Sequence, residues 1–344
     1  MIRTFYSSNY NWEFNTKTGE FKRWGHTFEN DPLYSPFGPE ILDIEISTIC
    51  HQGCSHCYKS NTSKGEYMSF ENYKNILDKM ENNLTQVALG IGDINYNLKT
   101  LEHILAYTRE LNIMPNITIN GNINKNEASL LSRYCGAVSV SNYDKDICYN
   151  AVELLYNEGM KQTNIHQLIS LETLLQTLQM IIDSIYDTRL KNINAIIFLL
   201  LKPKGDRNNY KPLSFKTLKE LILFASKHIP KLGFDSCFAP MVLKILGDSN
   251  PELLNMIEPC ESGIFSSYVN VKGEYFPCSF SEKENEGLSV LNCNNFLEDI
   301  WNNPKTIEIR NKIINSSFTC DCNFKKYCRR CVAYPEITNC LKEK

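Results

Sequence analysis

The feature that most constrains the fold is a regular alternation of apolar, strand-like runs with segments of helical periodicity. Between the first two runs, apolar residues recur at steps of three and four, as at Phe70, Tyr73 and Leu77. Successive strand–helix units predict parallel strands joined by right-handed crossovers, in an open sheet or a partial barrel. In either case, functional residues are expected beyond the carboxyl ends of the strands. The strand-like runs span residues 41–47, 86–90, 116–120, 137–141, 164–170, 194–201 and, more weakly, 232–236.

The alternation divides the 344-residue chain into three parts. Residues 1–38 include a stretch at 12–24 that alternates around a glycine-containing turn and predicts a β-hairpin. Residues 39–240 carry the strand–helix alternation and predict the core barrel. In residues 241–344 the alternation stops, and cysteines and short turns take over. We therefore expect an N-terminal extension, a core domain and a smaller C-terminal domain.

The chain contains fourteen cysteines, and they are unevenly placed. The start of the sequence lacks the apolar core of a secretion signal, and no apolar run approaches the roughly 18 residues that span a bilayer. We therefore expect a cytoplasmic protein, in which thiols stay reduced and metal or cluster ligation explains the cysteines better than disulfides. The net charge of −3 gives no general attraction to nucleic acid or to anionic membranes.

Three of the cysteines form a C-x3-C-x2-C motif directly after the first strand-like run. Cys50, Cys54 and Cys57 fall in the predicted loop between a strand and a helix, which is the expected place for a functional site. Three thiolates are one ligand fewer than zinc or ordinary iron–sulfur sites use. One interpretation is a zinc site that takes His51 or His56 as its fourth ligand.

The motif, followed by the aromatic Tyr58, resembles that of the radical S-adenosylmethionine (SAM) superfamily. In this family, three cysteines hold a [4Fe–4S] cluster, and the amine and carboxylate of SAM chelate its open iron. The resemblance implies that Cys50, Cys54 and Cys57 bind this cluster, and that the α/β fold is a partial (β/α)6 barrel of the TIM type. The residues that it places near SAM are Tyr58, Gly90, Ile91, Gly92, Asp93, Asn120, Ser139, His166 and Leu199.

Later strand ends agree with this resemblance. Residues 90–93, Gly-Ile-Gly-Asp, stand where the family has a Gly-Gly-Glu-Pro motif that holds the methionyl amine. Glycines let the backbone approach a small ligand, and the aspartate could accept a hydrogen bond from an ammonium group. Asn120 ends the third strand-like run, and Ser139 lies within the fourth, where it would contact the methionyl carboxylate. His166 and Leu199 would approach the ribose and adenine, although a simple position in the barrel core is an open alternative.

The C-terminal cysteines resemble the SPASM domain, an extension of radical SAM enzymes that carries auxiliary iron–sulfur clusters. Cys260 and Cys278 fit C-x12-G-x4-C, and "CDCNFKKYCRRC" forms a C-x-C-x5-C-x2-C block. The family form of this block is C-x2-C-x5-C-x3-C, so two gaps are one residue shorter here. The resemblance implies one or two auxiliary clusters: an outer one on Cys320, Cys322, Cys328 and Cys340, and an inner one on Cys260, Cys278 and Cys331.

The inner cluster would be one ligand short. Cys237, just past the last strand-like run, is the best candidate for the fourth ligand. An open iron that binds substrate is the competing possibility. For the outer site, the shortened C-x-C spacing also allows a structural zinc held by four thiolates.

The resemblance implies an enzyme that reductively cleaves SAM to a 5′-deoxyadenosyl radical, which abstracts a hydrogen atom from the substrate. SPASM-bearing enzymes mostly modify peptides or proteins, so a cross-link, a thioether or an epimerised residue is the expected product. A flavodoxin- or ferredoxin-type protein would donate the electron. The alternatives are the same chemistry on a small molecule or nucleotide, and a non-catalytic iron–sulfur or zinc protein that transfers electrons or serves as a scaffold.

Two further groups of charged residues belong to the predicted mouth of the barrel. Asp43 and Glu45 face together from the first strand, either as a base near the mouth or, more simply, as a solvated strand face. Lys202, Lys204 and Arg207 follow the sixth strand-like run, where they could meet an acidic substrate. No residue is assigned as catalytic from the sequence.

Overall fold

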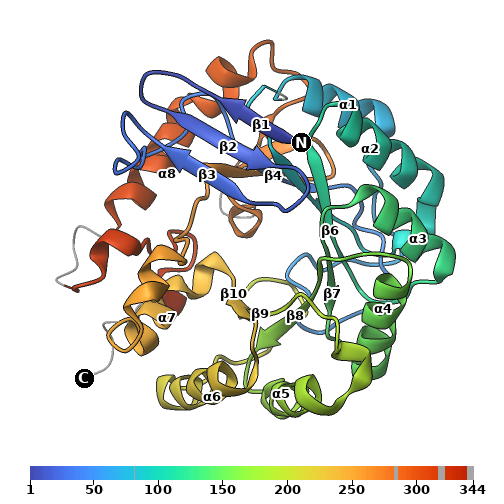
Figure 1. Ribbon diagram of the computed structural model, residues 1–344. Coiled ribbons are helices and arrows are strands. Elements are labelled where there is room, and N and C mark those ends of the chain that lie inside the picture. Colours follow the sequence, from blue (N-terminus) through green and yellow to red (C-terminus); the bar gives the residue numbers. More distant parts are fainter. Residues whose placement is uncertain (81, 283–285, 317–321, 339–344) are drawn as a thin grey trace.

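The structure, a computed structural model, describes residues 1–80, 82–282, 286–316 and 322–338 (Figure 1). Its main sheet has ten strands in the order β10-β9-β8-β7-β6-β5-β4-β11-β12-β13. Strands β4 to β10 lie side by side in chain order, and every neighbouring pair among them is parallel. These strands are β4 (Ile41–Glu45), β5 (Gln86–Gly90), β6 (Met114–Ile119), β7 (Val138–Ser141), β8 (Thr163–Ile169), β9 (Ala195–Leu200) and β10 (Leu232–Phe234).

Each of these strands lies within two residues of a predicted run at both ends, so the predicted α/β alternation with parallel strands is confirmed. The connecting helices form an outer ring around the curved sheet (Figure 1). Asn or Ser side chains cap several of these helices by accepting backbone N–H groups, as Ser69 does at the start of α1. The helices are α1 (Phe70–Asp78), α2 (Leu98–Glu110), α3 (Lys125–Tyr134), α4 (Lys145–Asn157), α5 (Leu174–Tyr186) and α6 (Phe215–His228).

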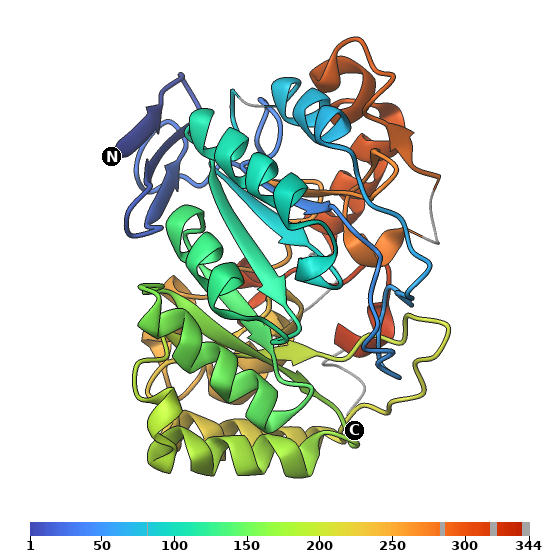
Figure 2. The same cartoon turned by 90° about the vertical axis from the view of Figure 1, so that its right-hand side faces the viewer.

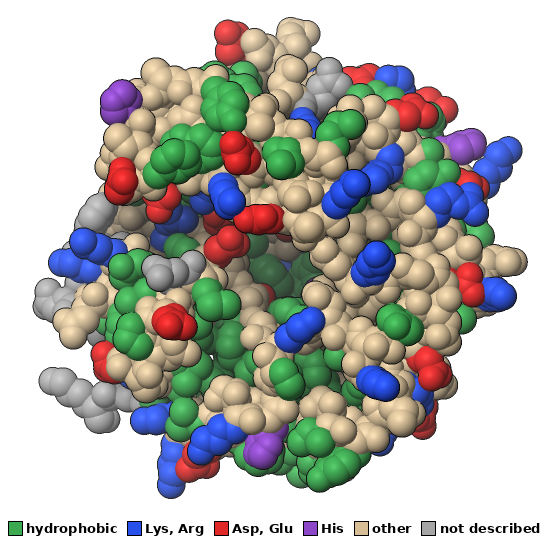
Figure 3. All heavy atoms as spheres, viewed as in Figure 1, with side chains coloured by type: hydrophobic (Ala, Val, Ile, Leu, Met, Phe, Trp, Pro, Cys, Tyr) green, Lys and Arg blue, Asp and Glu red, His purple; other side chains and the backbone are tan. Residues whose placement is uncertain are grey.

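The two faces of the parallel strands differ in burial. On β9, Ile196 and Phe198 are buried against the helices, whereas Ile197 and Leu199 on the opposite face are only half-buried. The same alternation on β8 leaves His166 half-buried on the inner face. Figure 3 shows a hollow at the centre of the molecule, lined by hydrophobic and acidic side chains. The inner faces of the strands therefore border an open interior.

The N-terminal segment forms a separate antiparallel sheet of β1 (Ile2–Phe5), β2 (Asn11–Asn15) and β3 (Phe21–Trp24). The predicted hairpin corresponds to β2 and β3, and β1 adds a strand that the sequence did not predict. Arg3 donates hydrogen bonds to the carbonyls of Leu84 and Asn112, which lie two residues before β5 and β6. This sheet therefore covers the amino ends of the barrel strands, opposite the loop that follows β4 (Figure 2).

The C-terminal part continues the main sheet on the other side of β4. Strand β11 (Ser266–Val269) pairs in parallel with β4, and β12 (Glu274–Phe276) and β13 (Leu288–Ser289) follow in antiparallel order. The sequence did not predict this continuation. Two helices, α7 (Ala239–Leu246) and α8 (Pro304–Asn315), also belong to this part. The short helical turns of the chain are η1 (Ile94–Asn97), η2 (Thr188–Leu190), η3 (Ser236–Phe238), η4 (Pro251–Asn255), η5 (Ser279–Ser281), η6 (Leu297–Trp301), η7 (Lys325–Tyr327) and η8 (Pro335–Thr338).

Among the described residues, no helix has both the length and the apolar character needed to cross a membrane.

Candidate active site

The first cysteine group consists of Cys50, Cys54 and Cys57, in the loop between β4 and α1. The loop is held in shape by backbone hydrogen bonds, including one of 2.9 Å from the Cys50 N–H to the Thr62 carbonyl. All three thiols are free and partly exposed. Burial raises the pKa of the Cys54 thiol to about 11, and repulsion from the Cys57 and Cys50 thiolates adds to the shift. The three thiols are therefore electrostatic neighbours.

Glycines allow other loops to pack closely against this group. A Cβ at Gly92 would overlap the Ile49 carbonyl oxygen and would lie 2.8 Å from Cβ of Cys50. Gly205, at a φ of +110°, approaches the carbonyl of Cys57 just as closely. The missing side chain of Gly92 thus makes room for the cysteine loop, and the contact of Gly92 with SAM stays a prediction.

Asp93 joins the ends of β5 and β6 to the first cysteine group. Its Oδ2 accepts from the backbone N–H of His51 at 2.9 Å and lies 2.6 Å from the His51 ring Nδ1. Its Oδ1 accepts from the amide of Asn120 at 3.1 Å. A pocket of about 410 Å³ opens beside this arrangement. Its lining residues are His51, Gln52, Asp93, Asn95 and Asn122.

His56 and Tyr143 also adjoin the thiols. The His56 ring contacts the rings of Tyr143 and Tyr210, at centroid distances of 5.2 and 5.0 Å. Both His56 nitrogens are buried and have no hydrogen-bond partner among the described residues, and burial lowers the pKa of this ring. The Tyr143 hydroxyl interacts electrostatically with all three thiolates. An unpartnered imidazole beside three thiols fits a site that binds another polar molecule.

Sequence reasoning considered His56 only as a zinc ligand and missed Tyr143. The sequence could have indicated Tyr143 by its position two residues after the fourth strand-like run, at the edge of the sheet where functional residues are expected. The zinc interpretation needs His51 or His56 as the fourth ligand, but Nδ1 of His51 already contacts the Asp93 carboxylate. Within the described ranges, no three His, Cys, Asp or Glu side chains are arranged to hold a single metal ion.

The other residues predicted near SAM are more dispersed. Ser139, His166 and Leu199 lie on the inner faces of β7, β8 and β9, and burial lowers the pKa of His166 to about 4, so this ring is neutral. Gly90 and Ile91 lead from β5 into the segment beside the loop. Tyr58 packs against Phe280, with ring centroids 4.6 Å apart, and so contacts the C-terminal part of the chain.

The second cysteine group consists of Cys237, Cys260, Cys278 and Cys331. Burial raises the pKa of Cys278 to about 11, and the thiols of Cys260 and Cys331 add to this shift. Burial also raises the pKa of the Cys237 thiol, and this thiol interacts electrostatically with Cys260 and Cys278. Each thiol of this group thus interacts electrostatically with at least one other member of the group. Cys322 and Cys328 are described, whereas Cys320 and Cys340 lie outside the described residues.

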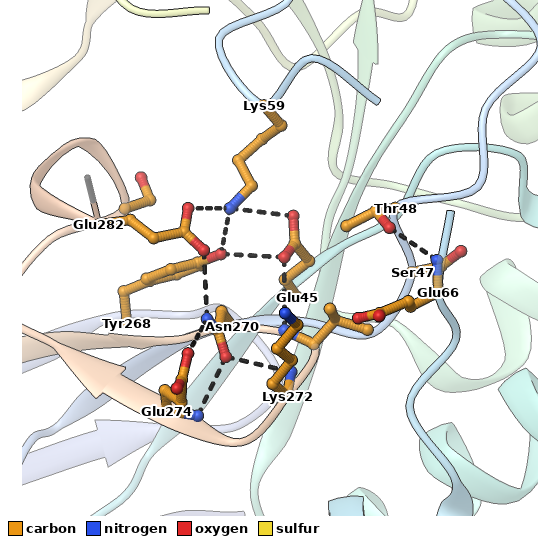
Figure 4. A network of polar contacts seen from close by, with 12 residues as sticks. Glu45, Ser47, Thr48, Lys59, Glu66, Tyr268, Asn270, Lys272, Glu274 and Glu282 are labelled. Atoms are coloured by element: carbon orange, nitrogen blue, oxygen red, sulfur yellow. Dashed lines mark hydrogen bonds and ion pairs between the residues drawn. The ribbon is translucent and has the colours of Figure 1, made fainter. Parts of the chain in front are cut away.

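A polar network centred on Lys59 joins the loop of the first cysteine group to the C-terminal part of the chain (Figure 4). Lys59 forms ion pairs with Glu45, at 3.2 Å, and with Glu282, and it donates a hydrogen bond to the Tyr268 hydroxyl. The Tyr268 hydroxyl donates to Glu45 at 3.1 Å, and the Asn270 amide donates to Glu282 at 3.2 Å. The network connects the residue after Tyr58 with β4, β11 and the turn that follows Cys278.

Glu45 is only 5% exposed, so a solvated strand face is the wrong description for it. Burial raises its pKa, and the nearby Lys59 opposes this effect. Asp43 lies on the same face of β4, and its side chain is exposed to the open interior of the barrel. Protein around this interior still reduces the hydration of the carboxyl group, and this effect alone raises the pKa of Asp43 to about 6. The two carboxyls thus differ in that Glu45 has a cationic partner nearby.

The expectation that Lys202 and Lys204 meet an acidic substrate is wrong for the structure described here. Their side chains are buried, at 6% and 4% exposure. Lys202 pairs with Asp235 at 2.6 Å, while Lys204 donates to the Ser279 carbonyl and lies 3.6 Å from Glu282. The sequence reveals these cations but not the distant acids that fold against them. Arg207 donates to the Asn61 carbonyl at 2.9 Å.

Comparison with known proteins places this geometry in a family. Residues 44–142, which include the first cysteine group, match the model of the radical SAM superfamily. The comparison with curated proteins found no match. The crystal structure of Streptococcus suis SuiB bound to precursor peptide SuiA is similar with a TM-score of 0.73, at 14% identity, over 96% of this chain and 94% of that one. SuiB bound to S-adenosylmethionine gives 0.67, at 16% identity, over 86% and 74%. At these identities the likeness to SuiB concerns the fold, whereas the family match confirms the resemblance of the cysteine motif: the chain carries a radical SAM domain.

Proposed function

We propose that this protein is a radical SAM enzyme that acts on a peptide or a protein. The observation that carries the proposal is the position of Cys50, Cys54 and Cys57 beyond the carboxyl end of β4, inside the matched domain and next to Asp93 and Asn120. The peptide substrate is supported by the similarity of the fold to that of SuiB, whose crystal structure contains precursor peptide SuiA.

The residues at this site fit the cofactors of the family. Cys50, Cys54 and Cys57 would hold a [4Fe–4S] cluster, and Asp93 offers carboxylate oxygens to the amine of SAM. The His56 ring lies in the same loop as these thiols, and its nitrogens have no hydrogen-bond partner among the described residues. When bound, the cluster and SAM supply a 5′-deoxyadenosyl radical, which abstracts a hydrogen atom from an unactivated carbon.

The task of the chain's own residues is to position this carbon and to exclude water. The inner faces of β7 to β9 offer a wall that is partly apolar, with Leu199, and partly polar, with Ser139 and the neutral His166. Asp43 stands on the same interior surface. A cross-link, a thioether or an epimerised residue would be the product.

The C-terminal cysteines would carry auxiliary clusters. We assign an inner cluster to Cys237, Cys260, Cys278 and Cys331, supported by the electrostatic proximity of their thiols. A SPASM-like domain over residues 241–344 would follow a core at 39–240 and an extension at 1–38. A flavodoxin- or ferredoxin-type donor and a cytoplasmic location complete the proposal. The outer cluster would be held by Cys320, Cys322, Cys328 and Cys340.

The test is anaerobic reconstitution with iron and sulfide, followed by iron counting and an assay for 5′-deoxyadenosine with SAM and dithionite. We expect 5′-deoxyadenosine from the wild-type protein and, with the correct peptide, a change in peptide mass. Cys293→Ala is a matched control, because its thiol hydrogen-bonds the Val290 carbonyl outside both cysteine groups. A reconstituted protein that binds iron but yields no 5′-deoxyadenosine would favour the non-catalytic alternative.

A further inference from the structure

Lys202 is a buried lysine immediately beyond β9 that the proposed chemistry does not use. Its ammonium group lies 2.6 Å from Oδ2 of Asp235 and 4.7 Å from the centroid of the Phe280 ring. Only 6% of the residue is exposed. A buried ion pair is costly to desolvate, and apolar residues of similar volume often serve stability equally well. Stability alone is therefore a weak explanation for this pair.

The position of Lys202 relative to the second cysteine group suggests a different role. Its ion-pair partner Asp235 lies only two residues before Cys237. The charge of Lys202 acts on the thiols of Cys237 and Cys331. Asp235 acts on the Cys237 thiol with the opposite sign. A cation therefore lies near two of the four sulfur atoms, and an anion lies near one of them.

We propose that Lys202 raises the reduction potential of the iron–sulfur cluster held by Cys237, Cys260, Cys278 and Cys331, and that Asp235 limits this effect. The inference rests on the auxiliary cluster of the proposed function. Reduction adds one negative charge to a cluster, so a nearby cation favours the reduced state. Because the pair is buried, bulk solvent and salt screen its effect only weakly.

The structural alternative is that Lys202 only holds Asp235 and the turn at η3 in place. The two explanations differ in the sign of their effects. A charge effect predicts that removing Lys202 and removing Asp235 shift the potential in opposite directions. A purely structural role predicts that both variants disturb the same turn and that neither shifts the reduction potential in a defined direction.

The experiment measures midpoint potentials by EPR-monitored redox titration of reconstituted full-length protein. A Cys50→Ala, Cys54→Ala and Cys57→Ala background removes the signal of the first cluster. On this background, we expect Lys202→Met to shift one midpoint to a more negative value and Asp235→Asn to shift it to a more positive value. The combined variant should lie between the two, and Lys202→Arg should stay near the parent value. An outer cluster, where present, serves as an internal standard whose midpoint does not move.

The Asp235→Asn variant is also a mild structural change. Asp235 Oδ1 accepts from the Phe238 N–H at 3.0 Å at the start of η3, and an asparagine oxygen can accept the same bond. Equal potentials for Lys202→Met and its parent, at equal iron and sulfide content, would overturn the proposal. If Lys202→Met does not take up iron, an unchanged midpoint in Asp235→Asn overturns it as well.

Failure of the underlying cluster assignment gives a different result. If Cys260→Ala and Cys278→Ala leave the iron content of the protein unchanged, the second cysteine group holds no cluster and the assignment itself is wrong. If those variants lose iron while the Lys202 and Asp235 variants keep the parent potential, the cluster stands and only the role of Lys202 is refuted.

Discussion

The first and second cysteine groups are assembled in different ways. Cys50, Cys54 and Cys57 lie within eight consecutive residues of one loop, so their proximity follows largely from their spacing. The second group draws its four thiols from separate segments between residues 237 and 331, and only the folded chain brings them together. The first group is thus a local sequence motif, whereas the second is a site that only the tertiary structure forms.

The surroundings of the two groups differ as well. The first group adjoins a pocket of about 410 Å³ and the polar side chains of Asp93 and Asn120. The second is flanked by the buried pair of Lys202 and Asp235 and by the ring of Phe280. This contrast is expected if the first group must leave room for a second molecule and the second group only exchanges electrons.

The strongest test of this contrast removes the first group alone. We expect Cys50→Ala, Cys54→Ala and Cys57→Ala together to reduce 5′-deoxyadenosine formation to background, because they remove the thiols of the proposed SAM-binding cluster. Part of the iron should stay bound at the second group. Iron counting and product analysis check both statements, and complete loss of iron would show that the two groups are not independent.

Lys59 tests the network that joins the two groups. Lys59→Met leaves the buried Glu45 and the half-buried Glu282 without this cation, which should lower the free energy of unfolding by about 3–5 kcal/mol. Urea denaturation of the variant measures the loss. Adding Glu282→Gln removes one of the two carboxylate charges and should recover part of the stability. A loss below about 1 kcal/mol would mean that the network is not a buried ion-pair site.

Gly92 and Gly90 form a matched pair for the packing of the cysteine loop. A Cβ at Gly92 would overlap the Ile49 carbonyl, whereas a Cβ at Gly90 would make ordinary contacts, the nearest at 3.4 Å from Cα of Glu45. Gly92→Ala should therefore cost about 1–3 kcal/mol and lower iron uptake at the first group, while Gly90→Ala should change both less. Equal iron content and stability in the two variants would contradict this packing role.

The smallest effect concerns pH. Because the pKa of Asp43 is raised to about 6 in the folded protein, the folded state binds more protons than the unfolded state between about pH 4 and pH 6. This carboxyl should therefore lower the stability as pH rises through that window. The effect should be on the order of 1 kcal/mol, since Asp43 is exposed to the open interior. Unfolding of wild type and Asp43→Asn across the window gives the difference, and identical pH profiles would refute the assigned environment.

Local patterns in the sequence predicted much of the fold. The strand ends were within two residues because burial against the outer helices imposes a repeating apolar pattern on each strand. The first cysteine group was also visible, because its three ligands are close in sequence. Its neighbours His56 and Tyr143 were harder to predict, since ring contacts across loops leave no periodic signal.

Long-range pairings were missed for the same reason. Nothing in "LKPKGDR" indicates that Lys202 meets Asp235 or that Lys204 approaches Glu282, so the sequence favoured exposed cations. The parallel pairing of β11 with β4 joins residues more than two hundred positions apart. Cys237 was singled out as a candidate ligand because of the family pattern, and the structure places its thiol in electrostatic range of Cys260 and Cys278.

The sequence by itself determined the α/β alternation, the parallel strands and the position of three thiols at a strand end, because each depends on residues that are neighbours in the chain. Tertiary structure alone decided which charges are neutralised, which loop requires Gly92 and which distant thiols gather into a second group. These outcomes depend on burial and on the distances between side chains, and both are defined only when the sheet curves around its interior.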